Sequence, residues 1–325
     1  MTTEFRAPPI DLALWKVMGH VYFASGSSAP ADIRGLARWL HPIGVSIPAL
    51  SERALVEIEY LTHGHTPVFV DTGAFSEVAM KGGRPVVVAP ISDTSWEERI
   101  AVELRLTRAL GPAAYCVAPD CVGDQTETLR RMSRFAREMG EVRALGGRVV
   151  VPLQRGAMST AAFDAACSSA LGFDDYVRGI PGNKDAMPLV ELESFLRAAR
   201  PPAIHVLGMG PRSTTFHAFC DTMRRLGRGV AISYDSNLIA AHVGRANGRA
   251  GAPRALTALQ AALAGDSGDK AREDAVAMLV GPSMLMARAA LAGLVGLREA
   301  APALPSLFDA FADTAPVTSS KDRTP

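Results

Sequence analysis

The chain has 325 residues, a formal net charge of +1, 48% hydrophobic residues and 21% charged residues. This composition is typical of a globular protein and excludes a disordered or fibrous one. With a net charge so close to zero, no global field draws the protein to nucleic acid or to an anionic membrane. Most of the positive charge is arginine, which suits bidentate phosphate contacts, although a biased genomic base composition would give the same abundance.

Targeting signals and cysteine usage indicate a cytoplasmic protein. The start, MTTEFRAPPIDLALW, lacks a basic segment followed by an apolar one, so no signal peptide is indicated. The longest apolar stretch, 284–297, contains Arg288 and is too short to span a bilayer, so we expect no membrane association. The scattered cysteines form no CxxC pair, and we expect buried free thiols at Cys116, Cys121, Cys167 and Cys220.

Eight short apolar runs rich in β-branched residues recur along the chain, each followed by a longer helical pattern. The runs are Val21–Ser25, Val45–Pro48, Val68–Asp71, Tyr115–Pro119, Val149–Gln154, Tyr176–Ile180, Ile204–Met209 and Val230–Asp235. Alternating strands and helices indicate a parallel sheet buried on both faces. Eight such units predict an α/β fold, a (β/α)8 TIM-type barrel, with an open doubly wound sheet as the alternative.

Two segments between the runs carry further predictions. Residues 126–145 place apolar side chains at helical spacing and arginines on the other face, which predicts one amphipathic helix. Its apolar positions are Leu129, Met132, Phe135, Met139 and Val142. The extra run Val86–Ala89 predicts a hairpin inserted after the third strand.

The chain changes character after Asp235. We expect helices around 237–246, 253–264, 269–280 and 282–299 and no further strand. The last residues are polar and contain proline, which predicts disorder. The expected organisation is a barrel catalytic domain over 1–250, a C-terminal helical extension over 251–311 and a disordered tail over 312–325.

Acids and an amide end several of the apolar runs, where a parallel barrel places its active site. They are Asp71, Asp120, Gln154 and Asp235, with Gly179 at a further strand end. Burying several carboxylates together is costly and separates their pKa values, so such a group is usually functional. For a single acid, such as Asp71 or Asp235, capping of the next helix is the alternative.

Six of these strand ends together resemble the tRNA-guanine transglycosylases. The segment VDTGAFS at 70–76 resembles the family's D-S-G-G-[FY]-Q strand end. The others follow in order: APDCVGD at 118–124, VPLQRGA at 151–157, RGIPG at 178–182, HVLGMGPRS at 205–213 and ISYDSN at 232–237. The match covers roughly residues 65–250; each motif alone is weak, but six in the right order are strong.

The resemblance implies roles for two acids. Asp235 would attack C1′ of the target nucleotide and expel guanine, leaving a covalent ester. Asp71 would then take a proton from the incoming base, which attacks C1′ from the original face. Two displacements at one carbon need a carboxylate nucleophile and a second acid/base, so the residue types agree with these roles.

The resemblance also implies a set of substrate-binding positions. They are Thr72, Phe75, Asp120, Gln154, Gly179, Ile180, Leu207 and Gly208. Asp120, Gln154 and the backbone at Gly179 and Ile180 would read the purine edge. Thr72 keeps the hydroxyl of the family's serine. Phe75 and Leu207 would sandwich the base, with a place in the barrel core as the alternative for both. A base in a duplex must first be flipped out, at a cost of a few kcal/mol.

Departures from the family pattern affect the metal and the incoming base. The family's zinc site follows the nucleophile as C-x-C-x-x-C…H, but no cysteine follows Cys220, and His242 alone cannot hold zinc. We therefore expect no zinc and no other cofactor. The family's glutamate for an aminomethyl group has no clear equivalent, although Asn183 and Asp185 stand nearby. A neutral substituent such as a nitrile suits this loss.

A basic segment follows the nucleophile strand. HVGRANGRAG at 242–251 resembles the family's T-R-N-x-R-N-G, and Arg245 and Arg249 share one helix face, from which they would grip phosphates. A solvated helix face is the equally weighted alternative.

The short chain, the missing zinc ligands and the loose motifs favour the branch of the family that inserts 7-deazaguanines into DNA. The expected partners are DNA, a free 7-deazaguanine base such as 7-cyano-7-deazaguanine, and accessory DNA-modification proteins, and a homodimer is left open. A divergent tRNA enzyme and a non-catalytic nucleic-acid-binding subunit are the alternatives. An unrelated lyase or aldolase would need a lysine or a metal cluster at a strand end, and none is visible.

Overall fold

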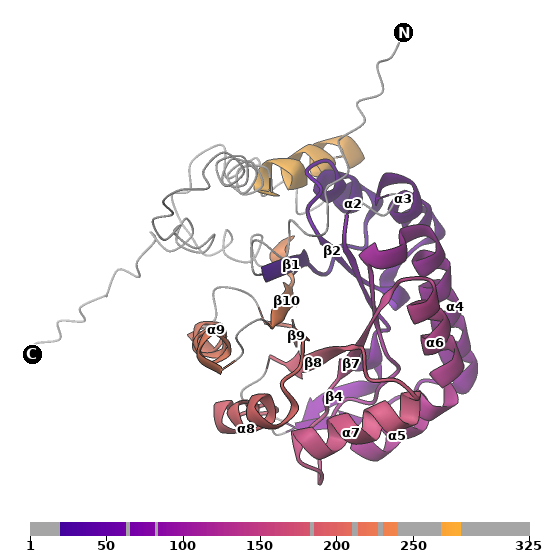
Figure 1. Cartoon of the computed structure of the whole chain (residues 1–325). Helices are drawn as coiled ribbons and strands as arrows, with labels where there is room; N and C mark the ends of the chain where they lie inside the picture. The colour runs from indigo at the N-terminus through magenta and orange to yellow at the C-terminus, as the bar shows by residue number, and fades with distance from the viewer. Residues whose placement is uncertain are drawn as a thin grey trace, which may run out of the picture.

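The fold is a closed barrel of eight parallel strands. The computed structural model describes residues 20–62, 66–81, 84–182, 185–209, 214–226, 230–239 and 268–280. Around the barrel the strands follow the order β1-β10-β9-β8-β7-β6-β3-β2. The first strand pairs with both the second and the last, which closes the sheet. The predicted barrel is therefore confirmed, and the open doubly wound sheet is excluded (Figure 1).

Each of the eight predicted apolar runs overlaps one barrel strand. The strands are β1 (His20–Ala24), β2 (Ile43–Ser46), β3 (Val68–Asp71), β6 (Ala114–Val117), β7 (Arg148–Pro152), β8 (Val177–Pro181), β9 (Ala203–Leu207) and β10 (Ala231–Ser236). The strands are mostly apolar because side chains on both faces are buried, some inside the barrel and the others beneath the helices.

The main helices follow the strands and cover the outside of the barrel. They are α2 (Pro30–Ala37), α3 (Glu52–Thr62), α4 (Asp93–Leu110), α5 (Gln125–Arg134), α6 (Ala136–Ala144), α7 (Thr160–Leu171), α8 (Leu189–Ala199) and α9 (Thr214–Leu226). Phe23 on β1 contacts Tyr115 on β6 and Phe69 on β3, and neither of these strands is next to β1 in the barrel. These aromatic rings therefore fill the barrel interior.

The helix predicted over 126–145 is two helices, and this part of the prediction is wrong. The chain leaves helical geometry at Phe135, with φ −103° and ψ 17°, between α5 and α6. The apolar face is nevertheless buried as expected at Met132, Met139 and Val142. Arg131 departs from the expected arginine face, since its side chain is only 5% exposed and pairs with the completely buried Glu77.

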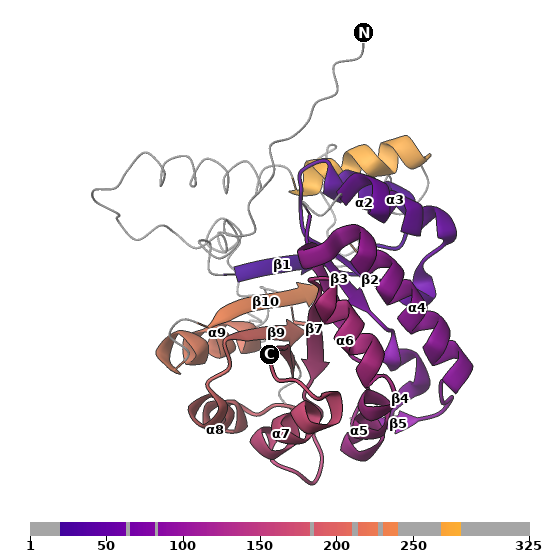
Figure 2. The same cartoon turned by 45° about the vertical axis from the view of Figure 1, so that its right-hand side comes forward.

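The hairpin predicted after the third strand is confirmed. It consists of β4 (Val78–Lys81) and β5 (Arg84–Val87), which pair antiparallel and follow the 3-10 turn η2 (Ala74–Glu77). Figure 2 shows the hairpin beside α5. Gly123, with φ +80°, lies so close that an added Cβ would meet Pro85 Cγ at 2.6 Å. The hairpin is therefore packed on the loop that follows β6.

Of the helices predicted after Asp235, the one over 269–280 lies wholly within the described residues and is confirmed. It lies beside α2 in both views (Figures 1 and 2). Its ion pairs to α2 and to Arg38, which follows α2, include Arg34–Glu273, Arg38–Asp274 and Asp32–Arg272. Most of the other three helices, the 312–325 tail, Arg245 and Arg249 lie outside the described residues.

Two further sequence expectations concern the cysteines and the membrane. Cys116, Cys121 and Cys167 are buried and free, as expected. Within the part of the chain that the structure describes, no helix is long and apolar enough to cross a membrane.

Candidate active site

The acids predicted at the strand ends meet at one rim of the barrel. Asp71 ends β3, Asp235 lies near the end of β10, and Asp120 follows β6. The negative charge of Asp235 acts on Asp71, and that of Asp71 acts on Asp120, in each case adding to the rise in pKa that burial causes. The three carboxyl groups are therefore close enough to share one electrostatic environment.

Asp235 is held as an ionised carboxylate. Its Oδ1 accepts a hydrogen bond from the backbone N–H of Gly208 at 2.7 Å and lies 3.2 Å from Nε2 of His205. Burial alone would raise the pKa of Asp235, but the contacts from His205, Gly208 and Ser25 outweigh it and bring the pKa below its usual value. The contacts from His205 and Gly208 lead back to β9 and the residue after it, so they are not those of a helix cap.

The pKa of Asp71 is shifted in the opposite direction to that of Asp235. Burial raises its pKa, and the charge of Asp235 adds to the rise, whereas the N–H of Gly73 opposes it. That N–H donates to Asp71 Oδ1 at 3.0 Å, and Gly73 adopts φ +77°, a conformation that favours glycine. Asp71 thus stabilises the turn that follows its strand but does not cap η2, whose N-cap is Gly73. Arg99 donates to the carbonyl of Thr72 at 2.8 Å and steadies the same turn.

Asp120 and Gln154 form a second, directly bonded pair on the rim. Gln154 Nε2 donates to Asp120 Oδ2 at 2.6 Å, and the backbone N–H of Gly123 donates to Gln154 Oε1 at 2.9 Å. The amide is therefore oriented by the loop after β6. Burial, with the charge of Asp71, raises the pKa of Asp120 to about 7.

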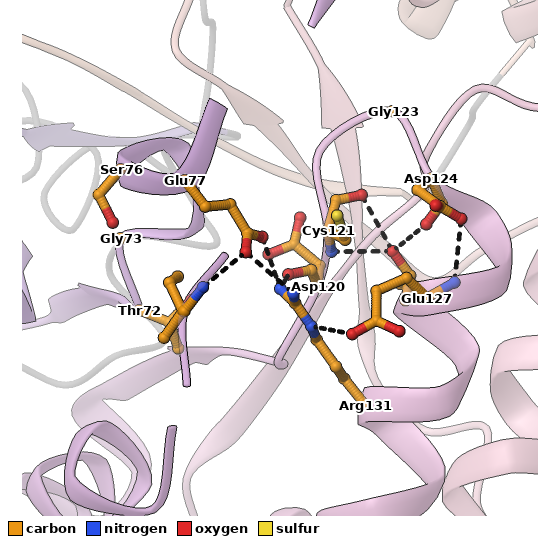
Figure 3. A network of polar contacts seen from close by, with 12 residues as sticks. Thr72, Gly73, Ser76, Glu77, Asp120, Cys121, Gly123, Asp124, Glu127 and Arg131 are labelled. Atoms are coloured by element: carbon orange, nitrogen blue, oxygen red, sulfur yellow. Dashed lines mark hydrogen bonds and ion pairs between the residues drawn. The ribbon is translucent and has the colours of Figure 1, made fainter. Parts of the chain in front are cut away.

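A buried ion-pair network lies behind Asp120 (Figure 3). Arg131 donates to Glu77 through both terminal nitrogens, at 2.6 and 2.9 Å, and to Glu127 through Nε at 2.8 Å. Its Nη1 also donates to the backbone carbonyl of Asp120 at 2.5 Å, and its guanidinium lies over the ring of Trp96. The network thus ties the base of the hairpin and α5 to the chain at Asp120.

The sequence reasoning missed Glu77 and Arg131. Arg131 lies three residues after Thr128 and four before Phe135, both buried, so helical spacing alone places it on the inner face of α5. A charged residue at such a position could have been noticed in the sequence. The partner of Arg131 could not, because Glu77 lies 54 residues earlier in the chain.

The structure distributes the other predicted substrate-binding residues between the rim and the layers below it. Phe75 is 67% exposed on η2, which excludes the barrel core as its place. Leu207 is partly buried against the interior cluster, and the buried Ile180 side chain belongs to the outer core, which leaves only its backbone for the site. Thr72 is fully buried, and its hydroxyl has no partner among the described residues.

Two glycines shape the backbone at the rim. A Cβ at Gly179 would meet Pro152 Cα at 3.1 Å and Leu207 Cδ1 at 3.2 Å, so glycine at this position allows its neighbours to pack closely. Gly208 adopts φ +67°, which lets its N–H point at Asp235.

His205 is a further site residue that the sequence reasoning did not single out. It is completely buried beneath Asp235 and stacks on Phe69, with ring centroids 4.3 Å apart and an interplanar angle of 9°. Its Nδ1 lies 2.9 Å from the hydroxyl of Ser233. A histidine inside the apolar strand β9 is a visible signal, but its bond to another strand is not.

The rim places two different acids together: Asp235, which stays ionised, and Asp71, which holds its proton more readily. Environments that separate the pKa values of two acids in this way are typical of a nucleophile and its acid/base partner. Among the residues that the structure describes, no group of three or more His, Cys, Asp or Glu side chains is arranged to hold a metal ion.

Comparison with known proteins shows no family for this chain. No protein-family model and no curated protein matches the sequence. Among solved structures, a candidate fructose-1,6-biphosphate aldolase from Coccidioides immitis is 12% identical, with a TM-score of 0.46, and the match covers 85% of this chain and 94% of that one. An L-ribulose 3-epimerase is 14% identical, with a TM-score of 0.42 over 87% and 99% of the two chains. At these values the likeness carries no argument about activity.

Proposed function

We propose that the chain is a base-exchange transglycosylase that replaces guanine in DNA with a 7-deazaguanine, such as 7-cyano-7-deazaguanine. The observation that carries the proposal is the pair of acids at one rim whose pKa values move in opposite directions, down at Asp235 and up at Asp71. The order of the six strand-end motifs supports the same chemistry.

In the first displacement, a carboxylate oxygen of Asp235 attacks C1′ of the target nucleotide. The C1′–N9 bond breaks, its electron pair leaves with guanine, and protonated Asp71 supplies the proton that makes guanine a neutral leaving group. The product is a glycosyl ester on Asp235. The raised pKa of Asp71 favours this role, since it keeps a larger fraction of the carboxyl group protonated.

In the second displacement, the deprotonated Asp71 takes the proton from the incoming base. The base nitrogen then attacks C1′ from the original face, and the ester bond to Asp235 breaks. Both acids return to their starting states, and C1′ keeps its configuration, as in retaining glycosidases.

Asp120 and Gln154 are the groups that we assign to the purine edge. Ionised Asp120 accepts hydrogen bonds from the N–H groups of a guanine-type edge, and Gln154 is already fixed beside it at 2.6 Å. Phe75, exposed on η2, is available to stack on a flipped base, with Leu207 on the other side.

DNA is preferred over tRNA as the substrate because no cysteine follows Cys220, so the zinc ligands of the tRNA enzymes are missing. Nucleoside mass spectrometry of DNA and tRNA decides the substrate, in a host that makes the deazapurine precursor. We expect a 7-deazaguanine nucleoside in DNA with wild-type protein and none with Asp235→Asn.

The matched control is Asp175→Asn, which changes a half-exposed acid that pairs with Arg143 and precedes β8, at the end of the barrel opposite the rim. It should modify DNA as the wild type does. A deazaguanine found only in tRNA would refute the DNA substrate and support the divergent tRNA enzyme. No change in either nucleic acid would refute the transglycosylase itself.

A further inference from the structure

A chain of three side chains lies under the rim, on two neighbouring strands. Ser233 and Asp235 point inward from β10, and His205 lies between them from β9, with Nδ1 2.9 Å from Ser233 Oγ and Nε2 3.2 Å from Asp235 Oδ1. The imidazole is completely buried between Phe69 and Phe23, so it contacts neither solvent nor a substrate in the mouth. Among the described residues, the acid that contacts the imidazole is Asp235.

The hydrogen on Nε2 is required by this geometry. A carboxylate oxygen can only accept, so Nε2 must donate to it. Ser233 satisfies the other ring nitrogen in either protonation state: its hydroxyl can donate to Nδ1 of the neutral ring, or accept from Nδ1–H while donating to the carbonyl of Ile204 at 3.3 Å. The histidine therefore keeps its donor on Asp235 whatever its own charge.

The hydrogen bonds to Asp235 from Gly208 and His205 reach the same carboxylate oxygen, and Ser25 also lowers the pKa of Asp235 through its side chain. The N–H of Gly208 and Nε2 of His205 both donate to Oδ1. A lone pair engaged in hydrogen bonds is a weaker nucleophile, so Oδ2 is the oxygen that can attack C1′. Fixing Oδ1 from below also fixes the rotation of the carboxylate, which sets the direction of attack.

We infer that His205, oriented by Ser233, is a positioning residue that binds Asp235 through Oδ1 and presents Oδ2 as the nucleophilic oxygen. The inference rests on the proposed function for the role of Asp235, but the contact itself does not depend on that role. Nothing in the strand-end motifs assigns this task to His205.

Two substitutions of His205 test its contact with Asp235 and its contact with Ser233 independently. In His205→Gln the side-chain amide reaches the place of Nε2 and can still donate to Asp235. In His205→Asn the shorter amide reaches only the place of Nδ1 and Ser233. Both variants remove the ring and its stacking on Phe69, so they are matched in the packing that they lose.

The first measurement is the ¹³C carboxyl titration of Asp235 by NMR, assigned with Asp235→Asn. We expect the pKa of Asp235 to rise by about one unit or more in His205→Asn and to stay near the wild-type value in His205→Gln, since one unit corresponds to the loss of a contact of about 1.4 kcal/mol. Ser233→Ala, which leaves the ring in place, should raise it by less and serves as the second variant if His205→Asn does not fold.

The second measurement is base exchange. We expect His205→Asn to lose about 100-fold in kcat with an unchanged KM, because the nucleophile is misplaced while binding is not. His205→Gln should recover most of that loss. Equal titration of Asp235 in all the folded proteins, or equal loss of kcat in both His205 variants, would overturn the inference.

A failure of the proposed function and a failure of the positioning role give different results in these two measurements. If wild-type protein exchanges no base in DNA or tRNA, the proposed function is refuted, and the titration still decides whether His205 holds Asp235. If base exchange is real but Asp235 titrates alike with and without His205, only the positioning role is refuted.

Discussion

At the scale of single residues, the rim places three carboxylic acids in three different environments. Hydrogen bonds, including those from His205 and Gly208, lower the pKa of Asp235. Burial raises the pKa of Asp71 in spite of the hydrogen bond from Gly73, and it raises the pKa of Asp120 to about 7. The three side chains have the same carboxyl group, so burial and hydrogen bonds determine how their pKa values, and hence their roles, differ. This is why the roles could not be read from residue type.

Asp120 should make the protein less stable as the pH rises. Its folded pKa of about 7 lies above the unfolded value of 3.8, so the folded state binds more protons between these values and stability falls as the pH rises through them. Asparagine does not titrate, so Asp120→Asn does not lose stability in this way as the pH rises. We expect the variant to exceed the wild type in free energy of unfolding by about 2–4 kcal/mol at about pH 8, and by almost nothing below about pH 4.

Urea denaturation at several pH values measures the difference. The same variant should bind the base poorly, since it loses the acceptor for the purine edge, so stability and function change in opposite directions. A stability difference that stays constant with pH would contradict the raised pKa of Asp120.

At the scale of elements, the hairpin and α5 are joined through one buried ion pair. Glu77 is completely buried at the base of the hairpin, and Arg131 on α5 is its partner. Removing Arg131 leaves Glu77 as an uncompensated buried charge, and removing Glu77 leaves the buried Arg131 with Glu127 as its remaining acid. We expect Glu77→Gln or Arg131→Met alone to cost about 3–5 kcal/mol of unfolding free energy, and the double variant to cost less than the sum.

A double-mutant cycle by urea denaturation measures this coupling. The control is the half-exposed pair Arg108–Glu141, which should contribute within about 1 kcal/mol. Since Arg131 also donates to the carbonyl of Asp120, Arg131→Met should raise KM for the base more than it changes kcat. Additive losses in the cycle would show that the pair does not couple the two elements.

The sequence predicts the strand ends better than it predicts what lies behind them. Asp71, Asp120 and Asp235 are visible because each follows an apolar run, and the parallel topology brings such ends together. The Glu77–Arg131 pair and the His205–Asp235 contact depend on how the hairpin packs and how neighbouring strands are in register. No local pattern encodes either contact.

At the scale of the whole molecule, the helix over 269–280 returns to the first part of the chain and packs on α2. Gly35 permits this approach, since a Cβ there would meet the carbonyl of Glu273 and Cβ of Val276, each at 2.7 Å. Gly140, in the middle of α6, has nothing within 4 Å of such a Cβ. The two helical glycines therefore form a matched pair.

We expect Gly140→Ala to raise the free energy of unfolding by up to about 1 kcal/mol, because alanine is the better helix former. Gly35→Ala should instead weaken the docking of 269–280. Hydrogen exchange should then be faster at 269–280, while the barrel strands keep their protection. Unchanged exchange in Gly35→Ala would show that the close approach is not required.

The eight-stranded barrel as a whole was predictable because each strand is a continuous apolar run followed by a helical pattern. The break between α5 and α6 was not, since Phe135 continues the helical spacing of buried residues while leaving helical geometry.

The covalent link to Asp235 tests the central claim most directly. Purified protein is incubated with a guanine-containing DNA oligonucleotide, quenched in denaturant and analysed by intact mass and peptide mapping. We predict a protein–DNA adduct in the wild type that maps to Asp235, is absent in Asp235→Asn and disappears when a 7-deazaguanine base is added. An adduct that persists in Asp235→Asn, or base exchange without any adduct, would contradict the account.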